Sequence, residues 1–441
     1  MSKKAFLSVL LTLLIVFGGL HLAENLQGKE WSTCAGASGD DWTMFHHDPA
    51  HTGTTTGSAP MKPVSLWNYT EGLYTSSTLS SSAVVVNGVV YAGSFRNPNE
   101  ASGNIYAFDA YTGTKIWTYA TDTYVQSASA VSENTLFIGV GSDVYALNAL
   151  TGAKVWSSQT GGVVAPTIVN GIVYVGSLDG NLYALDSSTG LKIWNYTTGS
   201  GINSSPAFAD GVVYVGSYDN NVYAINASTG TKVWNYTTYG SVTSSPAVSD
   251  GVVYVVSRDF RLAIGDENLY ALNASTGNQV WKYTFNPSLT RGIATSPAVA
   301  YGAVYAGSED GNVYAINAST GKKIWDFDTG YRVVSSPAVA EGVVYIGSGL
   351  GAVYALNAST GVTIWVFDTD NEVNASPAIA DGILYVGSKD GAFYAIGEHM
   401  SNDYKLFSVL WVTATVILVA VVGIGLLVYF KKRRHQTSFA S

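Results

Sequence analysis

The sequence predicts an all-β protein: an eight-bladed β-propeller of four-stranded antiparallel blades, followed by a C-terminal transmembrane helix. Composition is the first reason, because 47 of 441 residues are glycine and only 12% are charged, as in one large β structure punctuated by turns. The second reason is an internal repeat of four short strands. The third is that two elements of this repeat each occur eight times but are out of step along the chain.

One copy of the repeat is SSPAFADGVVYVGSYDNNVYAINASTGTKVWNYTT, residues 204–238. Runs rich in β-branched and aromatic residues, such as VVYVGS and NVYAIN, predict strands. The DNN or DGN between them predicts a hairpin turn, because Asn and Gly tolerate positive φ. ASTG predicts a second turn, and KVWNYT a further strand. The four strands of a copy are named A (SSPAV), B, C and D in chain order.

The two eightfold series predict that both ends of the chain close the ring. The C-strand tyrosines are Tyr106, Tyr145, Tyr183, Tyr223, Tyr270, Tyr314, Tyr354 and Tyr394. The D-strand tryptophans are Trp67, Trp117, Trp156, Trp194, Trp234, Trp281, Trp325 and Trp365. The first tryptophan precedes the first copy, and the last copy has no D strand of its own. We therefore expect residues 64–70 to complete the blade that holds residues 375–396, leaving no open edge.

The repeated YALNASTGxxxW pattern resembles the tryptophan-docking repeat of the PQQ-like propeller family, which comprises eight-bladed quinoprotein dehydrogenases and non-enzymatic relatives. The resemblance spans residues 41–397 and implies that each tryptophan packs against a neighbouring blade. Burying one indole removes about 150–250 Å² from water, which is a gross gain of several kcal/mol. The chain has a single cysteine, Cys34, and therefore no intrachain disulfide, so packing must hold the ring together.

Two apolar segments predict that the propeller lies outside the cell. Residues 1–23 resemble a signal peptide or an N-terminal anchor, and residues 406–430 are 25 uncharged residues, long enough to span a membrane. The basic sequence KKRRH follows directly, which places the C-terminus in the cytoplasm. The remaining expected parts are an N-terminal segment (24–63), the propeller (64–397), a tether (398–405) and a basic tail (431–441).

The sequence favours a binding protein over an enzyme. A net charge of -9 excludes nucleic acid as the expected partner, whereas an extracellular protein or glycan fits a surface location. The dehydrogenases that the repeat resembles hold PQQ over a calcium ion with Glu, Asn and a catalytic Asp, and many have a disulfide between adjacent cysteines. No catalytic motif is found, so we expect no cofactor and a scaffold or receptor role. The alternative is a cell-surface quinoprotein-like oxidoreductase.

The stretch DWTMFHHDPAHTG, residues 41–53, has two readings. It contains His46, His47 and His51, which suggests a metal site. However, Pro49 and the HTGTTTG run make a sustained helix unfavourable, and only a helix would bring His47 and His51 together. The family resemblance points instead to a W-x-x-x-x-x-D-x-x-x-T segment with Trp42, Asp48 and Thr52. We therefore expect a structural clasp that hydrogen-bonds to the propeller, with metal binding as the open alternative.

Several N-x-S/T sequons predict glycosylation in an extracellular location. In NAST the asparagine also occupies the position where its side chain caps the C-to-D turn. The candidate sites are Asn68, Asn195, Asn203, Asn226, Asn235, Asn273, Asn317 and Asn357, with Asn374 a weaker candidate because Pro377 follows closely.

Insertions in the repeat predict which face binds a ligand. The first and fifth copies have long B-to-C loops, and the D-to-A connection is long after Trp67 and Trp281. In a four-stranded blade these loops all emerge on one face, here called the loop face. Because copies one and five lie opposite each other, we expect their loops to flank the central channel on the side away from the membrane. The residues expected there are Arg96, Asn97, Arg258, Asp259, Phe260 and Arg261.

Overall fold

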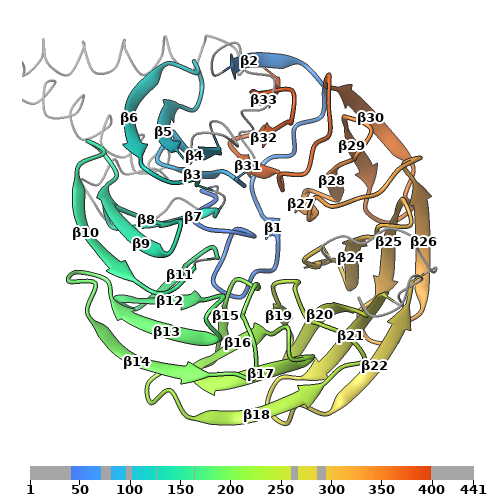
Figure 1. The fold of residues 1–441 in the computed structure, drawn as a ribbon. Helices are drawn as coiled ribbons and strands as arrows, with labels where there is room; N and C mark the ends of the chain where they lie inside the picture. Colours follow the sequence, from blue (N-terminus) through green and yellow to red (C-terminus); the bar gives the residue numbers. More distant parts are fainter. Residues whose placement is uncertain are drawn as a thin grey trace, which may run out of the picture.

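The structure is a computed structural model, and it describes residues 41–70, 81–95, 102–125, 127–162, 164–259, 267–285 and 295–398. These residues form eight sheets arranged as a ring (Figure 1). The expected eight-bladed propeller with four antiparallel strands in each blade is confirmed. Within the described part, no helix is long and apolar enough to cross a membrane. The predicted apolar segments 1–23 and 406–430 lie outside the described residues.

Each blade runs from an inner A strand beside the axis to an outer D strand (Figure 1). Blades 1 to 4 are β3 (Val84–Val86), β4 (Val89–Phe95), β5 (Gly103–Asp109), β6 (Lys115–Thr121); β7 (Ser129–Ser132), β8 (Thr135–Val140), β9 (Asp143–Asn148), β10 (Lys154–Gln159); β11 (Thr167–Val169), β12 (Ile172–Gly176), β13 (Asn181–Asp186), β14 (Lys192–Thr197); and β15 (Ala207–Ala209), β16 (Val212–Gly216), β17 (Asn221–Asn226), β18 (Lys232–Thr237).

Blades 5 to 8 follow the same order, except that the D strand of blade 8 comes from the start of the chain. They are β19 (Ala247–Ser249), β20 (Val252–Arg258), β21 (Glu267–Asn273), β22 (Gln279–Thr284); β23 (Ala298–Ala300), β24 (Ala303–Gly307), β25 (Asn312–Asn317), β26 (Lys323–Asp328); β27 (Ala338–Ala340), β28 (Val343–Gly347), β29 (Ala352–Asn357), β30 (Thr363–Asp368); and β31 (Ala378–Ala380), β32 (Ile383–Gly387), β33 (Ala392–Gly397), β2 (Ser65–Thr70).

The ring closes as the repeat count predicted. Strand β2 pairs antiparallel with β33, and Trp67 lies opposite Ala395. The order β2-β33-β32-β31 is therefore a complete four-stranded sheet built from the two ends of the propeller sequence. Figure 1 shows this in colour, because blue β2 lies beside red-orange β33. Without β2, blade 8 would have only three strands and β33 would be an open edge; the pairing of β2 with β33 removes that edge.

The outer D strands follow one pattern that explains why an exposed edge is tolerated. In β18, Lys232 and Val233 are exposed, Trp234 is buried and Asn235 is exposed again. Pairing jumps from Lys232 with Ile225 to Trp234 with Ala224, so Val233 is the extra residue of a β-bulge. The bulge turns the tryptophan inward, and an exposed lysine beside it discourages another strand from adding to the edge.

Each D-strand tryptophan joins its blade to the next one around the ring. In seven of the eight, the indole Nε1 donates a hydrogen bond to a backbone carbonyl in the C-to-D turn of the neighbouring blade, whereas Trp365 donates to the carbonyl of Pro60, ahead of strand β2. The pairs are Trp67 to Ala110, Trp117 to Ala149, Trp156 to Ser187, Trp194 to Ala227, Trp234 to Ala274, Trp281 to Ala318, Trp325 to Ala358 and Trp365 to Pro60, all at 2.8–3.0 Å. This is the arrangement that the family resemblance implied.

The glycine of ASTG is required for this contact. Gly230 has φ +69°, and a Cβ on it would lie 2.8 Å from the indole of Trp194. The turn backbone therefore rests directly on the ring face, which only a residue without a side chain allows. In most blades a B-strand tyrosine donates to the same carbonyl: Tyr214 OH, for example, is 3.2 Å from the Ala274 carbonyl that Trp234 also contacts.

Residues 41–60 cross the middle of the ring and hydrogen-bond to the inner strands of seven blades (Figure 1). Below, this stretch is called the axial segment. Its contacts are Trp42 with Val85, Thr43 with Val131, His51 with Thr167, Pro49 with Phe208, Ala50 with Val248, Thr52 with Val299 and Gly53 with Val339. Strand β1 (Thr54–Thr55) also pairs parallel with β27. These contacts are what the clasp interpretation requires.

The axial segment also replaces the turn that blade 8 lacks. Because β2 supplies its D strand, blade 8 has no ASTG turn to receive Trp365. The Pro60 carbonyl stands in its place and accepts hydrogen bonds from Trp365 Nε1 at 2.9 Å and from Tyr345 OH at 3.1 Å. One stretch of chain thus plugs the channel, docks blade 7 and leads into the closing strand.

We expect deletion of residues 60–70 to lower the melting temperature and to produce oligomers. The deletion removes β2 and the Pro60 carbonyl, and it leaves β33 as an open edge that another copy can pair with. Thermal melting and light scattering of the purified chain measure both effects. Lys62→Ala is the control, since Lys62 makes only an exposed ion pair with Glu398. A truncated chain that melts like the full one and stays monomeric would contradict the prediction.

Candidate functional site

A cavity of about 360 Å³ lies in the central channel on the loop face. Apart from Phe45 of the axial segment, its lining comes from D-to-A connections, B-to-C turns and the strand ends beside them. The lining residues are Phe45, Ser82, Tyr124, Ser127, Ala128, Gly139, Gly141, Gly162, Val164, Ala165, Leu178, Asn203, Ser205, Thr243, Ser245, Ser296, Val334 and Ser336. None of them is charged. This axial cavity therefore lies on the face where the sequence predicted ligand binding.

A ring of serines forms one side of the axial cavity. The serine three residues before the middle of the A strand, which proline follows in blades 4 to 8 and Ala83 follows in blade 1, forms a chain of hydrogen bonds in which the Oγ of one blade accepts the backbone N–H of its counterpart in the preceding blade. The bonds run from Ser205 N to Ser245 Oγ, Ser245 N to Ser296 Oγ, Ser296 N to Ser336 Oγ, Ser336 N to Ser376 Oγ and Ser376 N to Ser82 Oγ, at 2.9–3.1 Å. Each of these hydroxyls uses its oxygen as the acceptor.

The serine ring is interrupted in blades 2 and 3, where Ala128 and Ala165 occupy the same position. Beside them the wall is mainly apolar and includes Val164 and the exposed side chains of Leu178 and Tyr124. The axial cavity therefore has a hydroxyl side, over blades 4 to 7 and blade 1, and an apolar side, over blades 2 and 3.

Two further polar side chains lie on the hydroxyl side. Thr243 is 4% exposed, and its Oγ1 has no hydrogen-bond partner among the described residues. A buried hydroxyl without a partner is unfavourable by about 1–3 kcal/mol, so its presence here calls for an explanation. Asn203 is the second polar group, and it belongs to the sequon Asn203-Ser204-Ser205.

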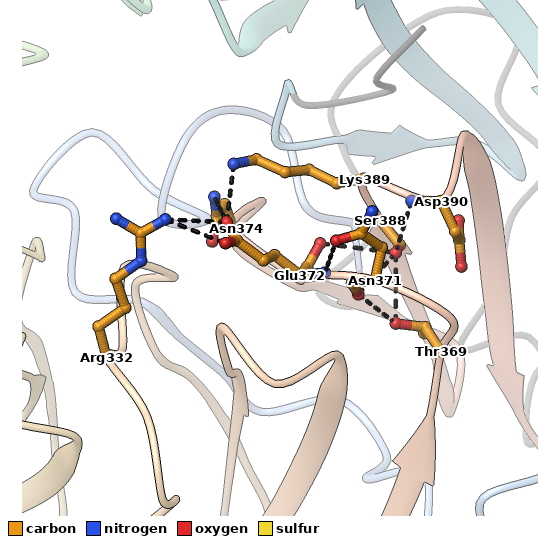
Figure 2. A network of polar contacts seen from close by, with 8 residues as sticks. All are labelled: Arg332, Thr369, Asn371, Glu372, Asn374, Ser388, Lys389 and Asp390. Atoms are coloured by element: carbon orange, nitrogen blue, oxygen red, sulfur yellow. Dashed lines mark hydrogen bonds and ion pairs between the residues drawn. The ribbon is translucent and has the colours of Figure 1, made fainter. Parts of the chain in front are cut away.

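An ion-pair network joins blades 7 and 8 on the same face (Figure 2). Arg332 Nη2 binds both oxygens of Glu372 at 3.0 and 3.1 Å, and Lys389 Nζ lies 2.7 Å from Glu372 Oε2. Asn374 Nδ2 donates to the same carboxylate. Burial alone raises the pKa of Glu372, but these hydrogen bonds outweigh burial and hold the pKa below its usual range. Both cations are thus engaged with Glu372, and neither lines the axial cavity.

The ligand-face residues expected from the loop insertions are only partly described. Arg96, Asn97, Phe260 and Arg261 lie outside the described residues, and Asp259 is the last residue described before that gap. Arg258 does not lie in a loop. It ends strand β20 with its side chain 2% exposed and pairs with the buried Glu309 of blade 6 at 2.7 Å. Arg258 therefore links blades 5 and 6 and is not available to a ligand.

The three histidines of the axial segment have different surroundings. His46 and His51 are buried, and their ring centroids are 6.5 Å apart. His47 packs edge-on against Trp42. Asp48 receives hydrogen bonds from the backbone N–H and the hydroxyl of Thr52, which fixes the turn and matches the Asp and Thr of the family pattern. Among the described residues, no three His, Cys, Asp or Glu side chains come together as a metal site.

Burial keeps two of these histidines neutral. Burial, followed by the nearby charge of His51, lowers the pKa of His46 from 6.5 to about 3. Burial likewise lowers the pKa of His51 to about 4. His51 Nε2 lies 3.1 Å from the hydroxyl of Thr167 in blade 3, so a neutral ring fits this contact. His46 and His51 are therefore uncharged within the channel plug at neutral pH.

The sequons fall into three structural groups. Asn226, Asn273, Asn317 and Asn357 cap C-to-D turns through Oδ1, as the turn interpretation predicted. Asn68, Asn195 and Asn235 are exposed on outer D strands. Asn203 and Asn374 lie on the loop face, where Asn203 lines the axial cavity and Asn374 Nδ2 is bonded to Glu372. The loop face therefore carries two sequons, a placement that repeat counting did not reveal.

This fold, with indole-docked blades and a plugged axis, defines a tryptophan-docked propeller, and sequence comparison supports the family. Residues 101–205, 197–330 and 309–402 match the family described as outer membrane protein assembly factor BamB. The chain belongs to this family, because the matches cover more than half of it. No curated protein matches the chain.

Solved structures share the fold at low sequence identity. BamB from Moraxella catarrhalis is 21% identical with a TM-score of 0.62, and the match covers 77% of this chain and 98% of that one. A europium-containing methanol dehydrogenase is 15% identical with a TM-score of 0.64, covering 82% and 98%. The quinohemoprotein alcohol dehydrogenase from Comamonas testosteroni is 17% identical with a TM-score of 0.64, covering 82% of each chain. These likenesses concern the fold, which scaffolds and enzymes share.

We expect acid to destabilise the propeller through His46 and His51. The unfolded chain takes up protons below about pH 6.5, whereas the folded chain keeps both rings neutral until about pH 4. The contribution of these two rings to stability is therefore steady above about pH 6.5 and falls as the pH drops, by about 1.4 kcal/mol per pH unit for each ring. Urea unfolding between pH 7.5 and 4.5 measures this slope.

The variant His51→Gln should roughly halve the slope while keeping a polar partner for Thr167. His47→Gln is the control, because His47 is partly exposed. An unchanged slope in His51→Gln would show that another group causes the acid sensitivity.

We expect the chain to bind no stoichiometric metal through His46, His47 and His51. Elemental analysis of protein purified without an affinity tag tests this directly. One zinc, copper or nickel ion per chain that disappears in a triple His→Ala variant would overturn the prediction.

Proposed function

We propose that the protein is a non-enzymatic binding propeller at the outer surface of the cell, anchored by residues 406–430, and that it takes an extracellular protein or glycan on the loop face. The axial cavity is the observation that carries this proposal. It is lined by uncharged residues of several blades and lies on the face where the insertions emerge. Membership in a family described as an assembly factor supports a binding role.

The direction of the chain supports the orientation. Strand β33 ends at Gly397, beside Gly382 of the A-to-B turn of blade 8, and so on the face opposite the axial cavity. A tether that starts there and enters a membrane at residue 406 turns the cavity away from the bilayer. The loop face is then the side that a soluble partner reaches first.

The lining of the axial cavity does not fit the calcium-bound quinone that the family resemblance implies. Calcium takes six to eight oxygen ligands with carboxylates among them, and no Asp or Glu is among the described residues that line the cavity. Phe45 of the axial segment occupies part of the lining as well. No step of quinone chemistry is therefore assigned to this chain.

We expect Leu178→Arg to abolish ligand capture without changing the melting temperature by more than a few degrees. Leu178 is 54% exposed at the axial cavity, so the new charge blocks an uncharged site without disturbing the core. Leu191→Arg is the matched control, because Leu191 is 69% exposed in the same blade on the opposite face.

The test uses the immobilised full-length chain in detergent and measures what each variant retains from an extract of envelope proteins and glycans. Equal retention by both variants would sink the proposed use of the loop face. An absorbance spectrum of the same protein tests the oxidoreductase alternative, since a bound quinone is chromophoric.

A further inference from the structure

The hydroxyl side of the axial cavity offers hydrogen-bond donors. In Ser245, Ser296 and Ser336 the oxygen already accepts a backbone N–H from the preceding blade. A hydroxyl whose oxygen accepts a hydrogen bond becomes a better donor of its own hydrogen. Each of these serines also lies two residues before the inner strand of its blade and is hydrogen-bonded to the preceding blade, so its position is fixed before any ligand arrives. Several donors thus converge on the axis from different blades.

The opposite side of the axial cavity offers an apolar surface. Ala128 and Ala165 remove the serine hydroxyls in blades 2 and 3, and Val164, Leu178 and Tyr124 complete the wall. Tyr124 is 42% exposed and supplies an aromatic ring that is apolar on its faces and polar at its tip. A ligand for this site therefore has one apolar side and one side rich in oxygen.

The absence of charge among the lining residues restricts the ligand further. Burying an ionised group is unfavourable unless an opposite charge accompanies it, and none of the described lining residues supplies one. The nearby cations Arg332 and Lys389 are paired with Glu372. The site therefore suits an uncharged ligand, and a volume of about 360 Å³ is at the small end of the range for small-molecule sites, about 300–1,000 Å³.

Thr243 shows that a polar atom is kept here at a cost to stability. Its hydroxyl is buried and has no partner in the part of the chain that the structure describes, and a valine side chain has the same shape. Valine would avoid that unfavourable burial, so the hydroxyl serves something other than the fold. Its place in the axial cavity makes a bound ligand the natural partner.

We propose that the axial cavity binds a neutral saccharide, with its hydroxyl oxygens on the serine side and the C–H face of its ring on Tyr124. This inference rests on the proposed binding function and specifies the ligand class of the same site. A pyranose ring combines many oxygen acceptors with an apolar face and no charge, which is the combination that the two sides of the cavity match.

The experiment titrates the full-length chain with neutral mono- and disaccharides, and with uronic acids of the same size, by calorimetry. The chain comes from a host that attaches no N-glycans, so that Asn203 carries no sugar of its own. We expect saturable binding of at least one neutral saccharide and weaker binding of its uronic acid counterpart. Thr243→Val should weaken binding about three- to tenfold, the effect of one lost hydrogen bond.

The same variant separates a binding role from a structural one. Without ligand, Thr243→Val should melt at the same temperature as the unaltered chain or higher, and Ser296→Ala should also weaken saccharide binding. Thr231→Val is the control, because Thr231 is exposed on a C-to-D turn of the opposite face. A Thr243→Val chain that melts lower and binds sugar unchanged would show that the hydroxyl is structural and would overturn the proposal.

The outcome also distinguishes the two levels of inference. If no neutral saccharide binds but Leu178→Arg still abolishes capture from the envelope extract, the ligand class is wrong and the binding function stands. If binding of uronic acids exceeds that of neutral sugars, the argument from the uncharged lining fails. If neither saccharides nor envelope components depend on the cavity, both proposals fail.

Discussion

The hydrogen bond from each outer-strand indole to the next blade is the interaction on which the ring depends. Neighbouring blades pack through the apolar side chains of their B and C strands; Val222 and Ala224 of blade 4, for example, belong to one buried cluster with Val253 and Val255 of blade 5. The tryptophan extends this contact to the perimeter, where it covers the turn backbone with its ring face and donates to the turn carbonyl. Gly230 against Trp194 illustrates both halves of the contact. Seven blades make this contact to the next blade, and in blade 7 Trp365 makes it to Pro60 of the axial segment.

The axial segment links the blades at the centre of the ring, also through hydrogen bonds to backbone groups. It satisfies inner-strand N–H groups of blade after blade, and it provides at Pro60 the carbonyl that Trp365 would otherwise lack. Its own turns are held by Asp48 and Thr52, while His46 and His51 fill the space between the inner strands as neutral rings. The same segment forms the bottom of the axial cavity through Phe45. Stability at the axis and the shape of the candidate site thus depend on one stretch of chain.

The sequence predicted the features that side chains encode and missed those made by backbone. Counting Trp67 against the last copy was enough to predict β2 beside β33, because the pattern of the strand is local. The path of residues 41–60 across seven blades has no such signal, since it is made mainly by carbonyl oxygens that every residue has. Arg258 was misplaced for a related reason: strands β20 and β21 run on to the Arg258–Glu267 pair, and loop length alone does not show where a hairpin stops pairing. An alignment of the SSPA motifs of all blades would have revealed the serine ring, and it would have shown that Ala128 and Ala165 replace the serine in blades 2 and 3.

Closure by the two ends has a consequence for the order of events in biosynthesis. Thr70 pairs with Ala392, so the strand synthesised first waits for a partner made more than 300 residues later. Joining such distant segments has a larger loop-closure entropy cost than closing a hairpin within a blade, and contacts of this kind form slowly. During that interval strand β2 lacks its partner β33, and the axial segment lacks the inner strands of the later blades. A nascent chain crossing a membrane would therefore need protection until its last blade emerges, and the finished ring would resist unravelling from either end.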